Sequence, residues 1–233
     1  MKRAWGFVLI AACGDTGQEH VELPLSATGT AAHPVAVGDA TIELTRADVA
    51  FGPMYSCASE AGRAELCEVA TAEFLETATV HALDPSEQPL GTLNATTGSV
   101  RSALFDYGIS WLLTENAPRA NRGAPEGHSA ILEGTVTRGA ARVRFSVIID
   151  AAPRMGGDLT VNGQQTRFDI QSGNNALNMT ADPHAWISNL DVDALFALDA
   201  DGDGTVAIPA DSVLHESILQ GMVSRAPLRF QWR

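Results

Sequence analysis

The chain has few basic residues for its length. Of its 233 residues, 15 are lysine or arginine and 28 are aspartate or glutamate, so its formal net charge is −13. An acidic surface repels the phosphates of nucleic acid, and this balance therefore argues against DNA or RNA as a partner. The same balance is compatible with the binding of cations.

Sequence signatures of common catalytic sites are also missing. The chain contains no nucleophile elbow, no glycine-rich phosphate loop and, outside one acidic loop, no paired-carboxylate motif. It contains no internal repeat of about 20–50 residues, which excludes solenoid and propeller architectures. We therefore predict that the protein is not an enzyme.

No apolar run reaches the roughly 20 residues that a membrane-spanning helix needs, but a shorter one lies at the N-terminus. Lys2 and Arg3 precede it, and two small residues and Cys13 end it. This order resembles the lipobox of bacterial lipoproteins, and an ordinary secretory signal is the alternative. The resemblance implies a signal peptide over residues 1–12, a lipid on Cys13, a tether over residues 13–34 and a membrane-anchored place in the cell envelope, facing the periplasm or the surface.

Only three cysteines are present, and the lipid would occupy the first. Cys57 and Cys67 remain, with nine residues between them. In an exported protein two remaining cysteines most simply form one disulfide. The alternative is a two-thiolate metal site, which would need further ligands beside it, and the neighbouring sequence supplies none.

Alternation of apolar and polar residues predicts strands over most of the chain. Residues 131–137 and 141–150 form the clearest pair, joined at Gly139, and Asn162-Gly163 predicts a second hairpin turn. Helical spacing appears only at residues 188–198 and 209–225. We predict an all-β, immunoglobulin-like or Greek-key sandwich over residues 35–233, with a helix–loop–helix insert near the C-terminus and a terminal strand.

One loop between the two predicted helices is rich in carboxylates. Asp199, Asp201 and Asp203 occupy positions 1, 3 and 5 of an EF-hand-like loop, Gly204 occupies position 6, and Thr205 at position 7 offers a backbone carbonyl. Oxygen ligands at this spacing suit Ca²⁺, because three carboxylates so close together repel one another unless a cation holds them. The alternative is a solvated acidic turn.

The loop departs from the EF-hand pattern at its last position. Ala210 stands where a bidentate glutamate is expected, so we predict Asp211 as the final ligand, with Glu216 or water as alternatives. The predicted role of the calcium is structural, since it would tie the two helices together.

A second candidate metal site combines His184 with Trp186. Pro183 disfavours helix at the residue before it, so we predict an extended segment in which both side chains face one side. His128, at the head of a strand and in phase with its apolar face, is the predicted second ligand. Two neutral imidazoles with a weak third ligand suit copper better than zinc, which takes four firm ligands.

The other histidines and tryptophans are predicted to have structural or solvent-exposed roles. They are His20, His33, His81 and His215, and the core residues Trp111 and Trp232.

The segment that begins His128-Ser-Ala-Ile-Leu-Glu-Gly-Thr, together with Asp182-Pro-His-Ala-Trp186 and the Asp-x-Asp-x-Leu that follows at 191–195, resembles the MbnP-like copper-binding proteins. The resemblance covers roughly residues 35–233. It implies a periplasmic or surface protein in which His128 and His184 bind copper. It also implies that Trp186 is oxidised to kynurenine by a partner di-haem enzyme of the cytochrome c peroxidase kind.

Two functions follow as hypotheses. The first is a lipid-anchored protein that captures or stores copper and carries a structural calcium loop. The alternative is a calcium-stabilised β-sandwich lipoprotein that binds an envelope protein or a glycan and no transition metal.

Overall fold

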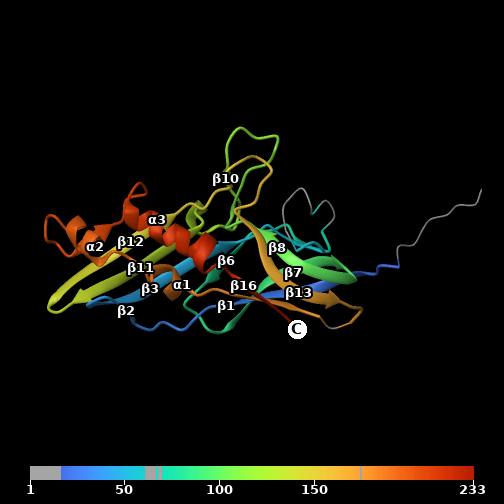
Figure 1. Cartoon of the computed structure of the whole chain (residues 1–233), viewed down its shortest axis with the longest axis horizontal. Coiled ribbons are helices and arrows are strands. Elements are labelled where there is room, and N and C mark those ends of the chain that lie inside the picture. The colour runs from blue at the N-terminus through green and yellow to red at the C-terminus, as the bar shows by residue number, and fades with distance from the viewer. Residues whose placement is uncertain (1–16, 61–66, 68–69, 174) are drawn as a thin grey trace, which may run out of the picture.

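The chain forms two large β-sheets with short helices over one end. The computed structural model describes residues 17–60, 67, 70–173 and 175–233. The two sheets enclose a shared apolar core and give the molecule an elongated shape (Figure 1). The predicted all-β sandwich is therefore confirmed.

The larger sheet has eight strands in the order β13-β8-β4-β5-β7-β1-β14-β16. The pairing of β1 with β14 is parallel, and the other neighbouring pairs are antiparallel. The strands are β1 (His20–Thr28), β4 (Met54–Cys57), β5 (Ala72–Phe74), β7 (Glu87–Thr96), β8 (Gly98–Phe105), β13 (Val161–Ile170), β14 (Leu177–Thr180) and β16 (Arg229–Trp232).

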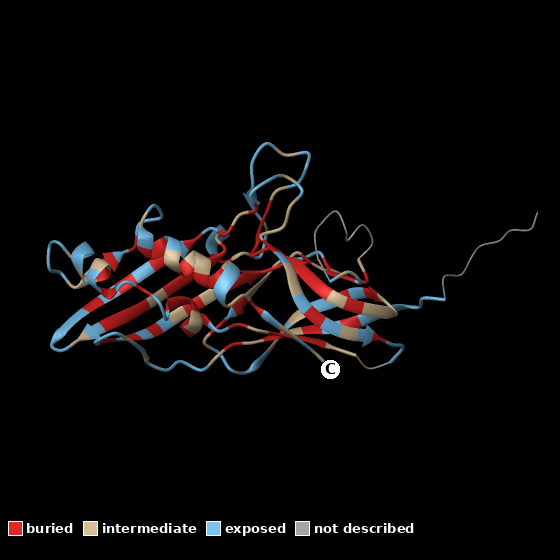
Figure 2. Cartoon of the chain, in the orientation of Figure 1, coloured by how far each residue is buried: buried red, intermediate tan, exposed pale blue. Residues whose placement is uncertain are grey.

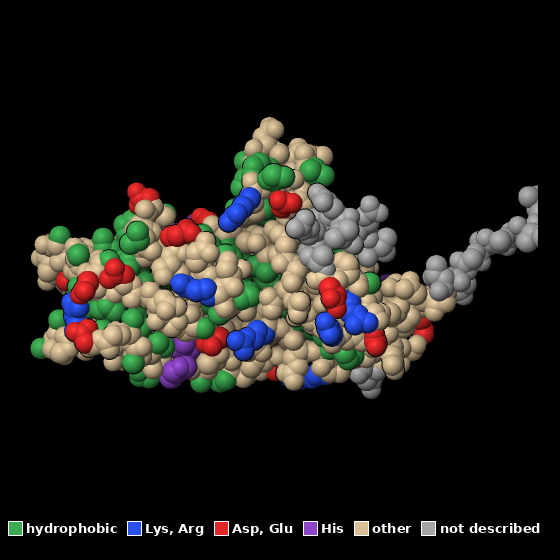
Figure 3. Space-filling view, viewed as in Figure 1, with side chains coloured by type: hydrophobic (Ala, Val, Ile, Leu, Met, Phe, Trp, Pro, Cys, Tyr) green, Lys and Arg blue, Asp and Glu red, His purple; other side chains and the backbone are tan. Residues whose placement is uncertain are grey.

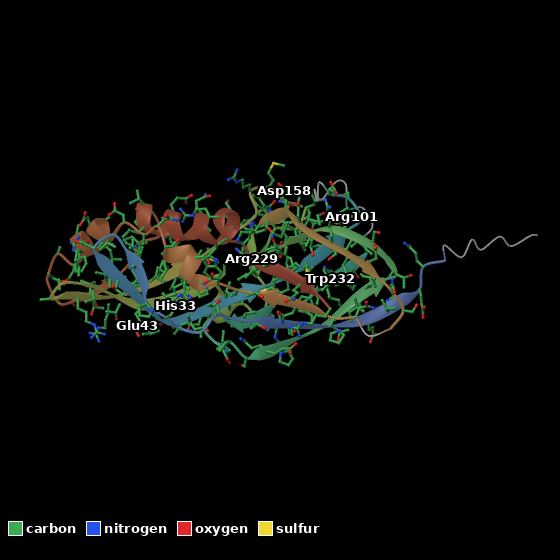
Figure 4. All side chains as sticks on the ribbon, turned by 60° about the horizontal axis from the view of Figure 1, so that its bottom comes forward. His33, Glu43, Arg101, Asp158, Arg229 and Trp232 are labelled. Carbon is green, nitrogen blue, oxygen red and sulfur yellow. A yellow bond between two sulfur atoms is a disulfide. The ribbon has the colours of Figure 1, made fainter. Side chains whose placement is uncertain are left out.

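The eight-stranded sheet curls until its two edges meet. Phe168 on β13 stacks on Trp232 of β16 with ring centroids 5.1 Å apart, and the Trp232 indole N–H donates to Thr166 Oγ1 at 2.9 Å. Figure 4 shows Trp232 on the C-terminal strand. Strand twist brings distant edges of a large sheet together in this way, and side chains rather than a backbone ladder join them here.

The smaller sheet has six strands. Its order is β15-β12-β11-β3-β2, and β6 pairs with the far end of β3. The strands are β2 (Val35–Val37), β3 (Ala40–Phe51), β6 (Ala78–His81), β11 (Ala130–Arg138), β12 (Ala141–Ile149) and β15 (Thr205–Ala207). A separate two-stranded ribbon, β9 (Ile109–Ser110) and β10 (Arg119–Ala120), and a 3₁₀ turn, η2 (Pro125–Gly127), complete the connections.

Alternation along the strands places apolar side chains inside. On β12, Val143, Phe145, Val147 and Ile149 are buried, and the residues between them are exposed: Arg144, Ser146 and Ile148. Figure 2 shows the same alternation along both sheets. Burial of each large apolar side chain contributes roughly 1.5–3 kcal/mol, so this pattern holds the sheets face to face.

Three short α-helices lie near the C-terminus, of which the sequence predicted the second and the third. They are α1 (Pro183–Ile187), α2 (Val192–Leu198) and α3 (Val213–Gln220), and α3 continues into a π-helical turn, η3 (Gly221–Arg225). Asp191 caps α2 and Ser212 caps α3, each through its side-chain oxygen. A Cβ on Gly221 would lie 2.7 Å from the Trp186 backbone, so α1 packs against this turn at a distance that only glycine allows.

Strand β1 corrects the predicted tether over residues 13–34. Leu23, Leu25 and Ala27 alternate with more exposed residues and are buried, so the folded domain begins near His20. Pro24 weakened the strand signal, because proline within a strand normally argues against it. The predicted signal peptide and Cys13 lie outside the described residues.

Two further predictions concern local chain geometry. The Cys57–Cys67 disulfide is confirmed, with Cα atoms 5.5 Å apart. The predicted Asn162-Gly163 hairpin turn is wrong, because both residues lie within the single strand β13. The register against β8 shifts there and Gly163 has φ 68°, so the positive φ that the dipeptide signals serves a bulge rather than a turn.

Candidate metal centre

The parallel pair β1 and β14 brings two distant segments to one place. Thr28 pairs with Thr180 at the end of both strands, and the Ala181 N–H donates to Thr28 O at 3.0 Å. Just beyond, Thr30 Oγ1 donates to Ala181 O at 3.1 Å. Because the two strands are parallel, their C-terminal ends lie together. The two segments therefore leave the sheet side by side, one toward β2 and the other into α1.

His33 and His184 meet a few residues after this exit. Their rings stack with centroids 3.8 Å apart and an interplanar angle of 29°, and the His33 backbone N–H donates to His184 Nε2 at 3.4 Å. We call these two side chains the imidazole pair. Figure 4 shows His33 on the segment between β1 and β2, and histidine side chains gather near this place in Figure 3.

The His184 ring is almost fully enclosed. The residue is 4% exposed, and its buried Nδ1 has no hydrogen-bond partner. The nearest carboxylate oxygen, Asp182 Oδ1, is 3.5 Å from Nδ1. Burial, reinforced by the neighbouring His33, holds the pKa of His184 below its usual value, and Asp182 acts in the opposite direction. At neutral pH the imidazole is therefore uncharged and keeps a lone pair for a metal.

The neighbours of the ring nitrogens indicate which nitrogen of each histidine carries the proton. His33 Nδ1 lies 3.1 Å from Ala31 O, so a proton on Nδ1 leaves the Nε2 lone pair free. In His184, Nε2 already accepts the contact from His33, and Asp182 stands on the Nδ1 side. Metal-binding histidines commonly donate their other ring N–H to a carbonyl or carboxylate, and both rings have such a group nearby.

The predicted extended segment around His184 and Trp186 is wrong. Both residues lie in helix α1, which starts at Pro183, and residues two apart on a helix do not share a face. Proline restricts the residue before it but is favoured in the first turn of a helix, so Asp182 becomes the helix boundary. The Trp186 side chain instead enters the core, where it is 0% exposed and its indole N–H donates to Ala226 O at 2.8 Å.

His128 does not join the imidazole pair. Its Nδ1 lies 2.9 Å from Asp150 Oδ1, and a third of its side chain is exposed. β2, which follows His33, pairs with one edge of β3 around Ile42, whereas the start of β11, which follows His128, pairs with the other edge at Val49. At about 3.3 Å per residue these points are roughly 23 Å apart along the strand. The histidine that lies beside His184 is therefore His33 and not His128.

The acidic loop forms the second centre. The carboxylate oxygens of Asp199, Asp201 and Asp203 lie within 4.8 Å of one another. Among the described residues, this is the group of at least three side chains that could hold a metal ion. Loop amides also turn toward them, since the Gly204 N–H donates to Asp199 Oδ1 at 3.1 Å. Gly202 and Gly204 both have positive φ, which gives the tight turn that this spacing predicted.

Thr205 starts strand β15 rather than a helix. The Arg144 N–H bonds to Gly204 O at 2.9 Å in the parallel pairing with β12, and the Thr205 N–H points the other way, to Asp203 Oδ1 at 2.7 Å. In a strand the carbonyl of a residue points to the same side as its amide, so Thr205 O faces the loop, as a position-7 ligand requires. Asp211 is not part of the carboxylate group.

The remaining candidates have other partners. His81 Nδ1 lies 2.8 Å from Asp48 Oδ1, and His215 Nε2 lies 3.1 Å from Ile148 O. Trp111 and Trp232 were predicted to be core residues, but both are only partly buried, and Trp232 packs against the core from its side. Apolar and polar residues alternate over residues 20–28, which predicts a strand there. That strand would have placed His33 just after the folded sheet rather than in a tether.

No protein-family model, curated protein or solved structure matches this chain. In the described part of the chain, no helix is both long enough and apolar enough to cross a membrane.

Proposed function

We propose that this protein captures or stores copper through the imidazole rings of His33 and His184. The observation that supports this most is the stacked, partly buried imidazole pair, in which His184 is neutral and has a buried nitrogen without a hydrogen-bond partner. A protein interior satisfies nearly all buried polar atoms, so an unpaired one indicates a role other than packing.

The donor set favours copper over zinc. Two imidazoles are available, and Asp182 is placed to orient His184 rather than to complete a four-ligand shell. Structural zinc takes four firm ligands, whereas imidazoles in a low-coordinate site suit copper. Bound copper would supply a redox-active cation, and the chain's own part is to hold two imidazole rings at one place.

The lipid on Cys13 and the modification of Trp186 belong to the same proposal through the resemblance to MbnP-like proteins. A lipid anchor would keep the copper centre at an envelope membrane. Oxidation of Trp186 to kynurenine by a di-haem partner must act on a fully buried ring, so it requires electron transfer through the protein or opening of α1. The modified peptide would gain about 4 Da, from the net loss of one carbon and gain of one oxygen.

Copper titration with X-ray absorption tests the central claim. We expect the purified protein to bind one Cu(I) per chain against a competing chelator, with an absorption spectrum fitted by two imidazole nitrogens and no sulfur. Sulfur scattering, or a chain that takes up no copper, would refute the proposal and favour the alternative, a calcium-stabilised binding module without transition metal.

We also propose that the carboxylate loop holds a structural Ca²⁺ through Asp199, Asp201, Asp203 and the carbonyl of Thr205, with Asp211 or water as the remaining ligand. The ion would fix the connection between α2 and β15, and through β15 the edge of the six-stranded sheet. Its removal should therefore lower the stability of the whole domain.

Chelation measures this contribution. With free Ca²⁺ at about a hundred times its dissociation constant, binding adds about 2.7 kcal/mol to stability, which corresponds to a fall in Tm of roughly 5–10 °C when EDTA removes the ion. Asp201→Asn should remove most of this calcium dependence. The control Glu43→Gln, at an exposed position on β3, should retain it. A Tm that EDTA leaves unchanged would show that the loop is a solvated turn.

A further inference from the structure

A cavity of about 240 Å³ lies between the loop that follows β9 and the loop that joins β12 to β13. The residues of its wall that matter here are Tyr55, Leu104, Asp106, Trp111, Asp158 and Leu159. Drug-sized ligands occupy pockets of roughly 300–1,000 Å³, so this cavity suits a smaller molecule. Asp158 is labelled on its loop in Figure 4.

The two loops hold each other in place. The Gly157 N–H donates to Trp111 O at 2.7 Å, and the Trp111 indole N–H donates to Glu115 O at 3.0 Å. A Cβ on Gly156 would lie 3.4 Å from the indole nitrogen, so the loop backbone packs closely on the ring. The indole is therefore a fixed part of the cavity wall.

Asp106 is a buried carboxyl group on this wall. It is 2% exposed. Ser110 Oγ donates to Oδ2 at 2.8 Å, and the Thr160 N–H donates to Oδ1 at 2.8 Å. Asn121 Nδ2 in turn donates to Ser110 Oγ at 2.8 Å. These bonds fix the orientation of the carboxyl group, and they leave Oδ2 with capacity to accept another donor.

In the described part of the chain, no cationic side chain compensates the charge of Asp106. None of the ion pairs between described residues includes it, and the described wall of the cavity contains no lysine, arginine or histidine. Burial raises the pKa of Asp106 to about 6, although the bonds from Thr160 and Ser110 act against this rise. A buried carboxylate without a cation is costly, and a bound cation would offset that cost.

The rest of the wall is aromatic and aliphatic. Tyr55 and Trp111 present ring surfaces, Leu104 and Leu159 add apolar surface, and the rim carries a second carboxylate, Asp158. Aromatic faces attract organic cations, and a carboxylate beside them fixes the position of the charge. A hydrated metal ion would leave the apolar wall uncovered, so an organic ligand is favoured.

The nearby described arginines line two adjoining grooves. One groove shares Tyr55 and Ser110 with the cavity and contains Arg119 and Arg122. The other shares Asp158 and Leu159 with the cavity and contains the exposed Arg154. Arg119 pairs with Glu115 at 2.9 Å, so part of its charge is already compensated. Exposed apolar side chains, Leu112, Leu113 and Met155, lie on the loops around the opening. Figure 3 shows hydrophobic side chains on the protruding loops.

We propose that this cavity binds a small organic cation, a primary amine with an apolar or aromatic body. Its ammonium group pairs with Asp106, and its body lies against Tyr55 and Trp111. This binding site is separate from the metal centre and does not depend on the function proposed for it.

Calorimetric titration with three matched probes tests the proposal at pH 7.5 on the purified protein. The probes are phenethylamine, 2-phenylethanol and phenylacetate, which share a ring and differ in charge. We expect phenethylamine to bind at least about tenfold more tightly than the other two, because a hydrogen bond to a buried charged group contributes that much or more. Equal binding of the amine and the alcohol, or no binding of the amine, would overturn the proposal.

Two variants locate the amine. Asp106→Asn keeps the shape of the side chain and an oxygen that accepts from Thr160, and it should lose at least about tenfold in phenethylamine affinity while 2-phenylethanol binding is unchanged. Glu43→Gln, at an exposed position on β3 outside the cavity, should change amine affinity less than about threefold, since exposed charges are screened. If Asp106→Asn binds the amine as wild type does, the assignment of the ammonium partner is wrong.

A third variant tests whether the ligand needs the space of the cavity, while Asp106 is kept. Leu159→Trp fills the cavity and keeps Asp106, so it should abolish phenethylamine binding even where Asp106→Asn does not fold. A melting curve on each variant shows whether it is folded. Retained amine binding in folded Leu159→Trp would place the ligand elsewhere and refute the site.

Discussion

Alanine in place of His33 is expected to lower copper affinity at least about a hundredfold, and His184→Ala should do the same. Each change removes one of the two imidazoles that meet beside the β1–β14 edge. Loss of an outer-shell partner alone typically costs about 10–100-fold in metal affinity, so loss of a ligand should cost no less. Competition titration with a Cu(I) chelator measures the effect directly.

His128→Ala is the control that gives this experiment its meaning. The residue lies with Asp150 on another part of the six-stranded sheet, so its removal should change copper affinity less than about twofold. His81→Ala, in an exposed pair with Asp48, provides a second control of the same kind. If His128→Ala abolishes binding and His33→Ala does not, the pairing proposed from the resemblance is right and the imidazole pair is structural.

The second large effect concerns stability. Trp186→Ala should lower the free energy of unfolding by about 3–5 kcal/mol, since it leaves a large cavity among core residues and frees the carbonyl of Ala226. Domains of this kind are stable by only about 5–15 kcal/mol, so the variant loses a large share of its stability. The midpoint of urea unfolding, at unchanged slope, measures the difference.

Trp232→Ala is the matched control. Its ring is partly exposed and stacks on Phe168 at the seam between β13 and β16, so its loss should cost clearly less than that of Trp186. Equal costs for the two tryptophans would mean that Trp186 is not the packing centre of α1. Trp186→Phe should cost less stability than Trp186→Ala, because it keeps most of the apolar volume. It should still cost some, because it loses the hydrogen bond to Ala226.

The carboxylate loop and the histidines differ in how far sequence could predict them. Asp199, Asp201 and Asp203 lie within five consecutive residues, so their meeting follows from local turn geometry, and the glycines that allow it are visible in the chain. Trp186 shows the opposite case. Its proximity to His184 in sequence suggested a shared role, and the helical rise and rotation of α1 send the two side chains in different directions.

The buried carboxyl group of Asp106 had no sequence signal of its own. Asp106 stands among ordinary strand and loop residues, and its donors Ser110 and Thr160 are up to 54 positions away. Burial and the lack of a cationic neighbour, which make it a candidate binding residue, are properties of the assembled loops. A tryptophan that the sequence analysis placed in the core, Trp111, lines the same cavity.

Alternation of apolar residues and turn chemistry by themselves determined the all-β sandwich, the β11–β12 hairpin, the helices α2 and α3, and the Cys57–Cys67 bridge. These depend on periods of two or 3.6 residues, on caps and on the scarcity of cysteine, all of which are local. The tertiary structure alone decided that His33 rather than His128 meets His184. Parallel pairing of β1 with β14 joins residues about 150 positions apart, and no local pattern specifies which distant strand takes that place.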